Sequence, residues 1–412
     1  MTAPRDPLPR QVPRWSELRP LLQLAGPPRR AARVAAAASI DELRDLARRY
    51  TPRAAFDYVD GAAETERSYA RSRDAFDRVE FRPQVLRDVS APDPSTTILG
   101  RPSALPLVLA PTGFTRMMHH RGEFAVAPAA AAAGVPYALS TMGTVSPERL
   151  SAAQGDDGAE RWFQLYLWRD RAASKELLAR AAESGYRALV LTVDTPVAGA
   201  RLRDVRNGLT IPPALTARTL ADMGRHPSWW LNLLTTEPLT FASLTSTDGT
   251  VASMVDTVFD PSASMDDLDW LRGTWTGPLV VKGIQTAEDA RRVVDAGADA
   301  VVISNHGGRQ LDRAVTPLEE LPAVLDQVGD RAEVYLDGGV RNGADVVAAV
   351  ALGARACLVG RAYLYGLMAG GEAGVARALE ILGSDVRRTM ALLGTPTLDE
   401  LTGGSVRLRP AG

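Results

Sequence analysis

Cysteine is almost absent from this sequence: Cys357 is the only one in 412 residues. A single thiol cannot form a disulfide within the chain, and Cys357 stands inside the apolar run 356–359. The pattern predicts a buried structural thiol and favours a reducing, cytoplasmic setting. Long apolar runs are lacking too. None reaches the roughly 18 residues that a membrane-spanning helix needs, so we expect no transmembrane segment.

An excess of charge of one sign is also lacking. Lys and Arg total 47 against 49 Asp and Glu, a net charge of −2 at pH 7, and the pI is about 6.2. Nucleic-acid binding normally needs a basic surface, so this balance argues against such a partner. Hydrophobic residues at 45% and charged residues at 23% are typical of a soluble globular protein.

Residues 1–38 are rich in proline and arginine and then in alanine. A secretory signal would need an apolar centre, and prolines would interrupt the amphipathic helix of an organelle presequence. We therefore expect an extended N-terminal arm that packs on the body or on a neighbouring subunit. Ser39 and Glu42 have the spacing of a capping box, so a helix should begin there and cover about 40–50.

From residue 105 onward, short apolar runs alternate with Ala- and Glu-rich stretches that close on glycine. The runs predict eight strands: Leu105–Pro111, Pro136–Thr141, Arg161–Trp168, Ala188–Asp194, Pro278–Gly283, Ala300–His306, Glu333–Gly339 and Ala356–Arg361. The helices between them include Gly122–Ala133, Ser174–Ser184, Thr286–Ala296, Pro317–Val328 and Asn342–Leu352. Eight β-then-α units predict a closed (β/α)8 TIM barrel within residues 39–412, an α/β fold whose active site forms where the strands end.

One connection is much longer than a single helix requires. The segment after the fourth strand, about 197–272, is expected to be an insertion on the active-site face, either a lid or a partner surface. It holds Pro212-Pro213, Trp229-Trp230 and the polar run Thr245–Thr250. The two tryptophans either pack against the barrel or face a membrane or a quinone, and the first alternative is slightly favoured.

The most informative stretch is Ala300–Asp312, AVVISNHGGRQLD. Its apolar start predicts a buried parallel strand, and polarity switches where that strand should end. His306 can accept a proton near neutral pH, and the planar fork of Arg309 can hold a carboxylate at two points. Gly307 and Gly308 would open the turn between them. The alternative is a barrel loop with a capping histidine and a surface arginine.

Other strand ends supply further charges. Asp194 ends the fourth strand and is the best-placed carboxylate to orient an imidazole, or else it caps a turn. Lys282 ends the fifth strand, where an unpaired buried ammonium would be costly, so it fits a cation set against an electron-rich cofactor. The remaining histidines stand away from the strand ends: His119, His120 and His226.

The last two strands end in DGGVRNG (337–343) and in Gly360-Arg361. In barrels, the loops after strands seven and eight commonly bind a phosphate through backbone N–H groups and a helix N-terminus. Arg341 and Arg361 would add positive charge, so we predict that a ligand phosphate binds here. Tyr58, in FDYVDG, is open to two interpretations: a core aromatic residue or a hydroxyl aimed at a ligand.

These strings together resemble one enzyme family. SNHGGRQLD, FDYVDGAAE, APTGF, WFQLYLW, LTVDTP, VVKG, DGGVRNG and VGRAYLYG are similar to the FMN-dependent 2-hydroxy-acid dehydrogenases and oxidases, in unbroken order from about residue 40 to 400. Within and after the insertion, HPSWWLNLLTTEPLTFASL and FDPSASMDDLDWLRGTWTGPLVVKGI most resemble the bacterial respiratory L-lactate dehydrogenases. The resemblance implies an FMN-binding barrel that oxidises 2-hydroxy acids.

The resemblance also implies roles for individual residues, and it implies no metal. His306 would be the catalytic base, held by Asp194, and Lys282 would stabilise negative charge on the reduced flavin. The substrate carboxylate would bind Tyr58, Arg201 and Arg309, and the substrate hydroxyl would bind Tyr166. The implied cofactor-binding residues are Pro111, Thr112, Gly113, Ser140, Gln164, Thr192, Lys282, Ser304, Asp337, Gly338, Gly339, Arg341, Gly360 and Arg361.

Two positions depart from the family pattern. Many members carry paired arginines after the TVDTP motif, whereas this chain reads Gly-Ala-Arg-Leu-Arg over 199–203. We expect Arg201 to face the substrate, with Arg203 as a competitor. Where glycolate oxidases carry tryptophan after the second strand, this chain has Met142, whose unbranched thioether leaves an adaptable pocket that suits a short alkyl group.

We therefore expect oxidation of an L-2-hydroxy acid, most simply L-lactate to pyruvate, with electrons passed to a quinone or a similar acceptor. The alternatives are an oxygen-using oxidase of lactate, mandelate-like or longer acids, an FMN enzyme with another substrate such as an amine, and a barrel that only binds. The resemblance also implies a homo-oligomer, a tetramer, in the cytoplasm. The insertion could contact the inner face of a membrane peripherally.

Overall fold

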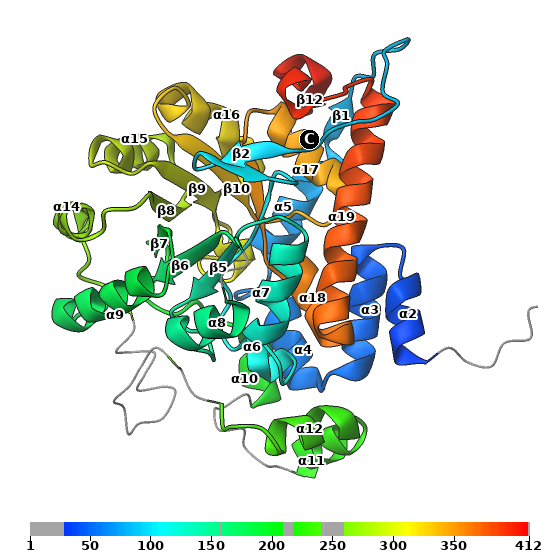
Figure 1. Ribbon diagram of the computed structural model, residues 1–412, viewed down its shortest axis with the longest axis vertical. Coiled ribbons are helices and arrows are strands. Elements are labelled where there is room, and N and C mark those ends of the chain that lie inside the picture. The colour runs from blue at the N-terminus through cyan, green and yellow to red at the C-terminus, as the bar shows by residue number, and fades with distance from the viewer. Residues whose placement is uncertain (1–28, 156–157, 209–216, 240–241, 243–258, 411–412) are drawn as a thin grey trace, which may run out of the picture.

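The computed structural model describes residues 29–155, 158–208, 217–239, 242 and 259–410. Eight parallel strands form a closed barrel whose order follows the chain, as Figure 1 shows. The strands are β4 (Leu107–Leu109), β5 (Tyr137–Ser140), β6 (Arg161–Leu165), β7 (Ala188–Thr192), β8 (Leu279–Ile284), β9 (Ala300–Ser304), β10 (Glu333–Asp337) and β11 (Ala356–Val359). The predicted (β/α)8 barrel is confirmed.

The barrel interior is a packed core, because apolar side chains from every strand fill it. Trp162 and Tyr335 are its largest members, with ring centroids 6.1 Å apart. A hairpin of β2 (Thr96–Ile98) and β3 (Arg101–Ser103) adds Ile98 to this core. Next in the hairpin, the backbone N–H of Leu99 donates to Glu333 at the start of β10, at 3.1 Å. The hairpin therefore covers the N-terminal end of the barrel, and a ligand must enter at the C-terminal end.

Helices surround the strands and bury the outward-facing residues. They are α7 (Glu123–Ala132), α8 (Pro147–Gln154), α9 (Arg171–Glu183), α15 (Ala287–Asp295), α16 (Pro317–Val328), α17 (Gly343–Ala351), α18 (Arg361–Gly370) and α19 (Glu372–Leu393). The predicted helices are confirmed. Helix α9 begins earlier than predicted because the Asp170 side chain accepts from the N–H groups of Ala172 and Ala173, at 2.9 and 3.1 Å.

Several strands end before the predicted position. β9 ends at Ser304, so His306 lies in a 3-10 turn, η2 (His306–Gly308), and not in the strand. The Ser304 Oγ accepts the His306 N–H at 2.9 Å, which takes this donor out of the sheet. β10 ends at Asp337, because Gly338 and Gly339 have φ values of 110° and 89° that no regular strand contains.

The described part of the predicted N-terminal arm is helical where we expected an extended chain. Its Ala-rich sequence forms α2 (Arg30–Ala36). Arg30 donates to the carbonyls of Met368 and Ala369 at 2.8 and 2.7 Å, so this segment packs on the body. The N-cap that follows is confirmed, but the reciprocal half of the predicted capping box is not, because the Glu42 carboxylate accepts from the Ala38 N–H at 3.0 Å and not from the Ser39 N–H. In α3 (Ile40–Tyr50), the Ser39 Oγ accepts from the Glu42 N–H at 3.1 Å.

A long connection joins β7 to β8. Its described helices are α10 (Leu202–Asn207), α11 (Ala217–Gly224), α12 (Pro227–Leu234) and α14 (Met265–Thr274). In Figure 1, α10–α12 lie below α4 (Arg53–Asp60) and α6 (Thr115–Met118). Trp229 packs against the core and donates from Nε1 to the Met117 carbonyl at 3.0 Å, which agrees with the favoured packing alternative. Pro212-Pro213 and Thr245–Thr250 lie outside the described residues.

Two further features complete the fold. Helix α5 (Arg67–Asp77) leads into β1 (Val79–Phe81), which pairs antiparallel with β12 (Val406–Leu408) near the C-terminus. Cys357 is a fully buried free thiol in β11, as predicted. Within the described ranges, no helix combines the length and the hydropathy needed to cross a bilayer.

The last two long helices, α18 and α19, cross at two glycines. Gly366 and Gly374 lie backbone to backbone, and a Cβ on either would overlap the carbonyl group of the other. Such contact allows two helices to approach more closely than side chains permit. This crossing places α18, whose first turn lies at the open end of the barrel.

We expect Gly374→Ala to lower the free energy of unfolding by roughly 1–3 kcal/mol, because the added methyl overpacks a backbone contact. Thermal unfolding measured by circular dichroism checks this. Gly273→Ala in α14 is the matched control, since a Cβ there meets nothing within 4 Å, and it should leave the melting temperature unchanged or slightly raised. Equal melting temperatures for the two variants would contradict the close crossing.

Candidate active site

A pocket opens at the C-terminal end of the barrel. The predicted site residues that line it are Tyr58, Pro111, Thr112, Gly113, Met142, Tyr166, Arg201, Lys282, His306, Arg309, Asp337, Gly338, Gly339, Arg341, Gly360 and Arg361. The other predicted residues lie behind this lining: Ser140, Gln164, Thr192, Asp194 and Ser304. Of the four histidines, all within the described residues, His306 alone reaches the pocket.

His306 and Asp194 lie side by side at the ends of β9 and β7. The imidazole Nδ1 lies 3.0 Å from Asp194 Oδ1, so Nδ1 faces the carboxylate and Nε2 remains for a ligand. His306 has a φ of 57°, in the left-handed region that non-glycine residues rarely adopt. Gly283 makes room for the pair, because a Cβ on it would lie 2.7 Å from the Asp194 Cβ.

Two arginines flank the ring of Tyr58. The Cζ of Arg309 lies 4.9 Å from the ring centroid, and that of Arg201 lies 5.4 Å from it. Arg309 Nη1 also donates to the carbonyls of Tyr58 and Gly61 at 2.6 and 3.1 Å. Burial and the neighbouring Arg201 lower the pKa of Arg309 to about 10. Two guanidinium groups held this close favour an anion between them.

Lys282 points from β8 into the pocket and is almost fully buried. Its Nζ lies 2.6 Å from Asp337 Oδ2 and donates to Ser304 Oγ at 2.9 Å. Burial alone would lower the pKa of Lys282, but the charge of Asp337, assisted by Asp194, outweighs burial and raises it. Lys282 is therefore a stable ammonium at the barrel mouth, as its position in the sequence suggested.

A chain of buried polar side chains links three strands behind the pocket. The Ser140 Oγ donates to Gln164 Oε1 at 2.9 Å, and Gln164 Nε2 donates to Thr192 Oγ1 at 3.0 Å. These residues were predicted to touch the cofactor, but they do not line the pocket. They hold the ends of β5, β6 and β7 in a fixed relation. Ser140 Oγ also accepts the Met142 N–H at 3.1 Å, which fixes the backbone of that pocket residue.

The part of the pocket around Arg341 and Gly360, called here its phosphate end, suits a ligand with negative charge. Arg341 Nη2 donates to the hydroxyls of Tyr69 and Tyr365 at 2.6 and 3.1 Å. Arg341 Nη1 is buried and has no partner within the described part of the chain. Arg361 differs, because its guanidinium donates to the carbonyls of Val59, Gly61 and Gly307 at 2.7–2.9 Å. Of the two cations, Arg341 is the one with a terminal nitrogen that has no partner among the described residues.

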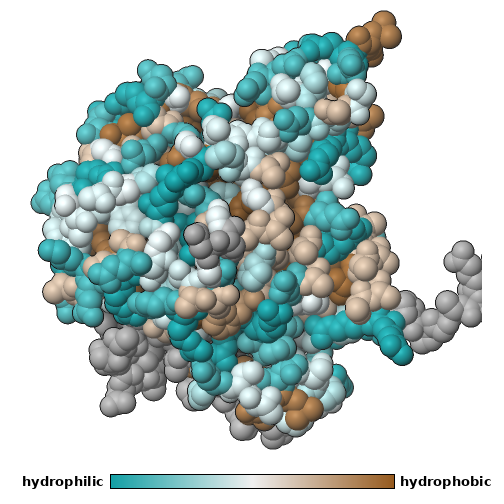
Figure 2. All heavy atoms as spheres, viewed as in Figure 1, coloured by the Kyte–Doolittle hydropathy of each residue, from teal (hydrophilic) through white to brown (hydrophobic). Residues whose placement is uncertain are grey.

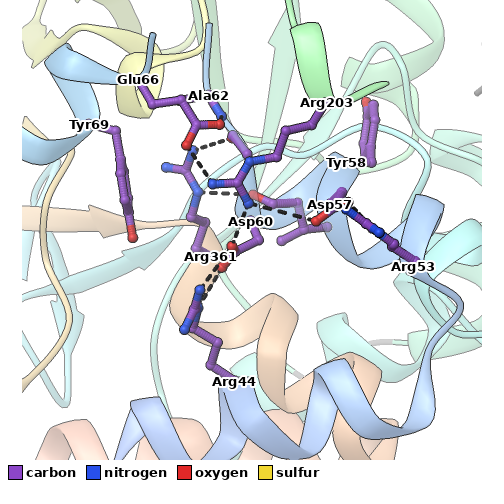
Figure 3. A network of polar contacts seen from close by, with 12 residues as sticks. Arg44, Arg53, Asp57, Tyr58, Asp60, Ala62, Glu66, Tyr69, Arg203 and Arg361 are labelled. Carbon is purple, nitrogen blue, oxygen red and sulfur yellow. Dashed lines mark hydrogen bonds and ion pairs between the residues drawn. The ribbon is translucent and has the colours of Figure 1, made fainter. Parts of the chain in front are cut away.

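The structure separates the two arginines that the sequence left in competition. Arg201 lines the pocket, whereas Arg203 turns away to Asp60 and Glu66, as Figure 3 shows. Met142 and Tyr166 both line the pocket, as predicted. The Tyr166 ring meets Phe259 edge to face at 5.3 Å.

Sequence reasoning missed several pocket residues. Tyr69 stacks beneath Arg361, with 4.7 Å between Cζ and ring centroid, but nothing in its local sequence marks it. Phe259 lies at the far end of the insertion, where no period or motif pointed to a ligand. Gln310 could have been found, because it belongs to the SNHGGRQLD string. Its amide donates to the carbonyls of Asp194 and Val197 at 3.2 and 2.8 Å, which fastens the insertion to the loop after β9.

Comparisons with known proteins agree with this geometry. Residues 47–408 match the family model of FMN-dependent dehydrogenases. A putative L-lactate dehydrogenase of Mycobacterium tuberculosis is 56% identical over 411 residues, 98% of each chain. An L-lactate dehydrogenase of Caulobacter vibrioides is 46% identical over 363 residues, 86% of this chain and 94% of that one.

A solved structure is similar as well. The crystal structure of the monotopic membrane protein (S)-mandelate dehydrogenase has a TM-score of 0.87 and 37% identity, and the match covers 91% of this chain and 100% of that one. The resemblance seen in the sequence is thus confirmed over nearly the whole chain. The protein belongs to the family of FMN-dependent dehydrogenases and is an oxidoreductase that uses FMN.

Proposed function

We propose that this enzyme oxidises an L-2-hydroxy acid to the 2-oxo acid, with L-lactate and pyruvate as substrate and product. One observation carries the proposal: the His306–Asp194 pair and the cations Arg201 and Arg309 converge in one pocket. A base beside a carboxylate site suits a substrate that is oxidised at the carbon next to its carboxylate. The names of the relatives, L-lactate and (S)-mandelate dehydrogenases, support this substrate class.

The residues around the pocket fit FMN. A phosphate oxygen would satisfy the unpaired Nη1 of Arg341. The first turn of α18, at Gly360 and Arg361, presents backbone N–H groups to the same end of the pocket. These residues would hold the phosphate, and Asp337 the ribityl chain. The ring would lie against the loop of Pro111, Thr112 and Gly113 and near Lys282.

Two electrons and two hydrogens leave the substrate when the alcohol becomes a ketone. His306 takes one hydrogen as a proton at Nε2, since Nδ1 faces Asp194. The Asp194 carboxylate stabilises the imidazolium that results. FMN, when bound, accepts the two electrons and the second hydrogen. Lys282, held as an ammonium by Asp337, would offset the negative charge gained by the cofactor.

The remaining pocket residues would orient the substrate. Arg201 and Arg309, which both lie beside the Tyr58 ring, would bind the substrate carboxylate, and Tyr166 would contact the substrate hydroxyl. Met142 supplies an apolar wall and is 9% exposed. That wall leaves an adaptable space that suits a short alkyl group, as in L-lactate, and leaves larger acids open.

We infer that the electron acceptor is a quinone, reached where the insertion touches the inner face of a membrane. Val205 of α10 and Leu231 and Leu234 of α12 are exposed large hydrophobic residues. Figure 2 shows apolar surface at the lower end of the view, over α11 and α12. Exposed apolar side chains gathered on one segment favour a lipid surface, and a solved relative is named a monotopic membrane protein. We further propose a cytoplasmic homotetramer.

We expect L-lactate to bleach the flavin of the oxidised, yellow protein under anaerobic conditions. His306→Ala should remain yellow and folded but should reduce roughly a hundred- to ten-thousand-fold more slowly, because it lacks the proton acceptor. Stopped-flow absorbance measures both rates. His120→Ala is the control, since His120 lies outside the pocket. Rapid reduction of the His306→Ala flavin would remove this residue from the mechanism, and a wild-type flavin that no 2-hydroxy acid bleaches would refute the function.

Met142→Ala should shift selectivity toward bulkier acids, because it removes most of one pocket wall. A methylene in such a pocket contributes roughly 1–3 kcal/mol of discrimination, so the preference for L-lactate over 2-hydroxyoctanoate should fall at least about tenfold. Specificity constants for L-lactate, 2-hydroxyoctanoate and mandelate test this, with flavin content as the control. An equal fall for all three acids would show that Met142 does not select the substrate.

The membrane contact predicts that α12 is needed to reach a quinone in lipid. Leu231→Ser combined with Leu234→Ser should weaken sedimentation with anionic phospholipid vesicles, because the exposed apolar area is lost. Reoxidation by a vesicle-embedded quinone should slow, while reoxidation by a soluble quinone stays unchanged. Leu392→Ser on α19, also exposed, is the matched control. Equal binding of all variants would place the contact elsewhere.

A further inference from the structure

Helix α10 carries the pocket residue Arg201 at its N-cap, yet little apolar packing holds this helix in place. It is six residues long, and none of its residues is buried. A helix this short is not stable by itself in water. Val205 is exposed and Leu202 is partly exposed, so the hydrophobic effect contributes little to its position. Polar contacts must therefore determine where α10 lies.

Those contacts reach the segment around the end of α4. Arg203 donates from Nη1 to Asp60 Oδ2 at 3.0 Å and pairs through Nη2 with Glu66. Asn207 Nδ2, at the other end of α10, donates to Asp57 Oδ2 at 2.8 Å. Figure 3 shows Asp60 between Arg203 and Arg44, with Glu66 on the other side of the Arg203 guanidinium. Arg203 is thus the charged link between α10 and the carboxylates of Asp57, Asp60 and Glu66.

Asp60, which pairs with Arg203, is itself held by several hydrogen bonds. It is 4% exposed, and Arg44 binds it at two points, at 2.5 and 2.9 Å. The Tyr365 hydroxyl donates to it at 2.8 Å. Burial would raise the pKa of Asp60, but the hydrogen bonds from Arg44, Tyr365 and Arg203 outweigh burial and hold it at about 2. The carboxylate is therefore charged at every pH at which the enzyme would work.

The same carboxylate also connects to the phosphate end of the pocket. Tyr365, which donates to Asp60, accepts a hydrogen bond from Arg341 Nη2 at 3.1 Å. Asp60 is thus connected to Arg341 through Tyr365 and to α10 through Arg203. The Asp60 carboxylate is therefore connected to the residues at both ends of the pocket.

Arg201 depends on α10 for its own position. Its guanidinium lies 3.7 Å from Asp204 of the same helix and 5.4 Å from the Tyr58 ring centroid. The Asp204 contact moves with α10, so it cannot locate Arg201 relative to the barrel. The Tyr58 ring is wide, so the Arg201 guanidinium could contact it from several positions and is not located by it. The backbone just before Arg201 is held by the Gly199 N–H, which donates to Gln310 Oε1 at 3.2 Å, and by the Ala200 carbonyl, which accepts from the Glu64 N–H at 2.8 Å. Beyond these bonds, the direction of the Arg201 side chain toward Arg309 depends on where α10 lies.

We propose that Arg203 is a positioning residue: its ion pairs with Asp60 and Glu66 fix α10 and so fix the Arg201 guanidinium beside Tyr58. The proposal rests on the proposed function, in which Arg201 binds the substrate carboxylate. Arg203 itself lies outside the pocket lining. Its effect on the substrate passes through the placement of Arg201.

The link can be cut without leaving a buried charge unpaired. When Arg203 is replaced, Asp60 keeps Arg44 and Tyr365, and Glu66 keeps the backbone N–H of Ala62 at 3.0 Å. Arg203→Met retains the apolar stem and loses the charge. We therefore expect a folded, yellow holoenzyme with wild-type flavin content.

The test compares holoenzymes of wild type, Arg203→Met, Arg203→Lys and Arg206→Met. Arg206 lies on the same helix and is exposed, so it is the matched control. Oxalate, a carboxylate ligand without an oxidisable hydroxyl, is titrated while flavin absorbance is followed, and KM and kcat are measured with L-lactate. For Arg203→Met we expect about a tenfold weaker oxalate Kd and a similar rise in KM, with kcat changed less than about threefold.

The conservative and control variants sharpen the result. Arg203→Lys should recover part of the loss, because lysine can still reach one carboxylate but cannot bridge two. Arg206→Met should behave as wild type. Wild-type oxalate affinity in Arg203→Met would overturn the proposal. A loss of melting temperature in Arg203→Met that accounts for the fall in activity, with no change in KM, would also overturn it.

A double-mutant cycle separates positioning from direct binding. If Arg203 acts through Arg201, adding Arg203→Met to Arg201→Met should not weaken oxalate binding further. Independent, additive losses would mean that Arg203 acts on the ligand by itself, and would overturn the proposal. Failure of the wild-type flavin to be reduced by L-lactate would refute the proposed function, whereas the oxalate affinities would still decide the role of Arg203.

Discussion

Positive charge gathered at the open end of the barrel is the constraint on which the rest of the site depends. Arg201, Lys282, Arg309, Arg341 and Arg361 all line one pocket. A buried cation is costly unless it is paired or hydrogen-bonded. Asp337 pairs with Lys282, and backbone carbonyls accept hydrogen bonds from Arg309 and Arg361. The carbonyl groups of the last turn of α4 and of Gly61 therefore accept hydrogen bonds from the two arginines.

The SNHGGRQLD segment, residues 304–312, carries His306 and Arg309 and also holds neighbouring segments in place. The Asp312 carboxylate accepts from the N–H groups of Thr65 and Ser68, at 3.1 and 2.8 Å, and Asn305 Nδ2 donates to Ser72 Oγ at 3.1 Å. These bonds tie the N-terminal half of α5 to the loop after β9. Close packing there leaves no space for a side chain at Gly308, where a Cβ would lie 2.7 Å from the Tyr69 nitrogen. His306 and Arg309 thus project from a turn that is held on both sides.

The barrel itself could be predicted from the sequence, because alternation of strands and helices is a local signal. The N-cap at Ser39 could be predicted in the same way. The ends of the strands were not, since a serine hydroxyl at 304 ends β9 through a bond to His306. Arg201 and Arg203 could not be told apart by sequence. Both flank one short helix, and the difference lies in Asp60 and Glu66, more than 130 positions away along the chain.

The sequence alone also could not predict contacts between side chains and groups that lie far away along the chain. Arg361 follows a glycine at the start of a helix, and the sequence predicts that it adds charge near a phosphate. The three carbonyls that accept from its guanidinium could not be predicted. Tyr69 stands in no string that marks it, and Tyr365 stands in VGRAYLYG without any sign of its partner, yet both hold Arg341. Such roles are set by tertiary contacts, which periodicity and motif spacing do not encode.

The insertion joins substrate binding to the outer surface of the molecule. Arg201 and Phe259, which line the pocket, belong to the same connection as the exposed apolar residues of α10 and α12. The phosphate end is built from barrel loops and long helices, and so it is rigid. The substrate end depends on a short helix that is held by ion pairs and hydrogen bonds. A partner or a lipid surface that moved α10 would therefore act first on the substrate carboxylate and leave the cofactor phosphate in place.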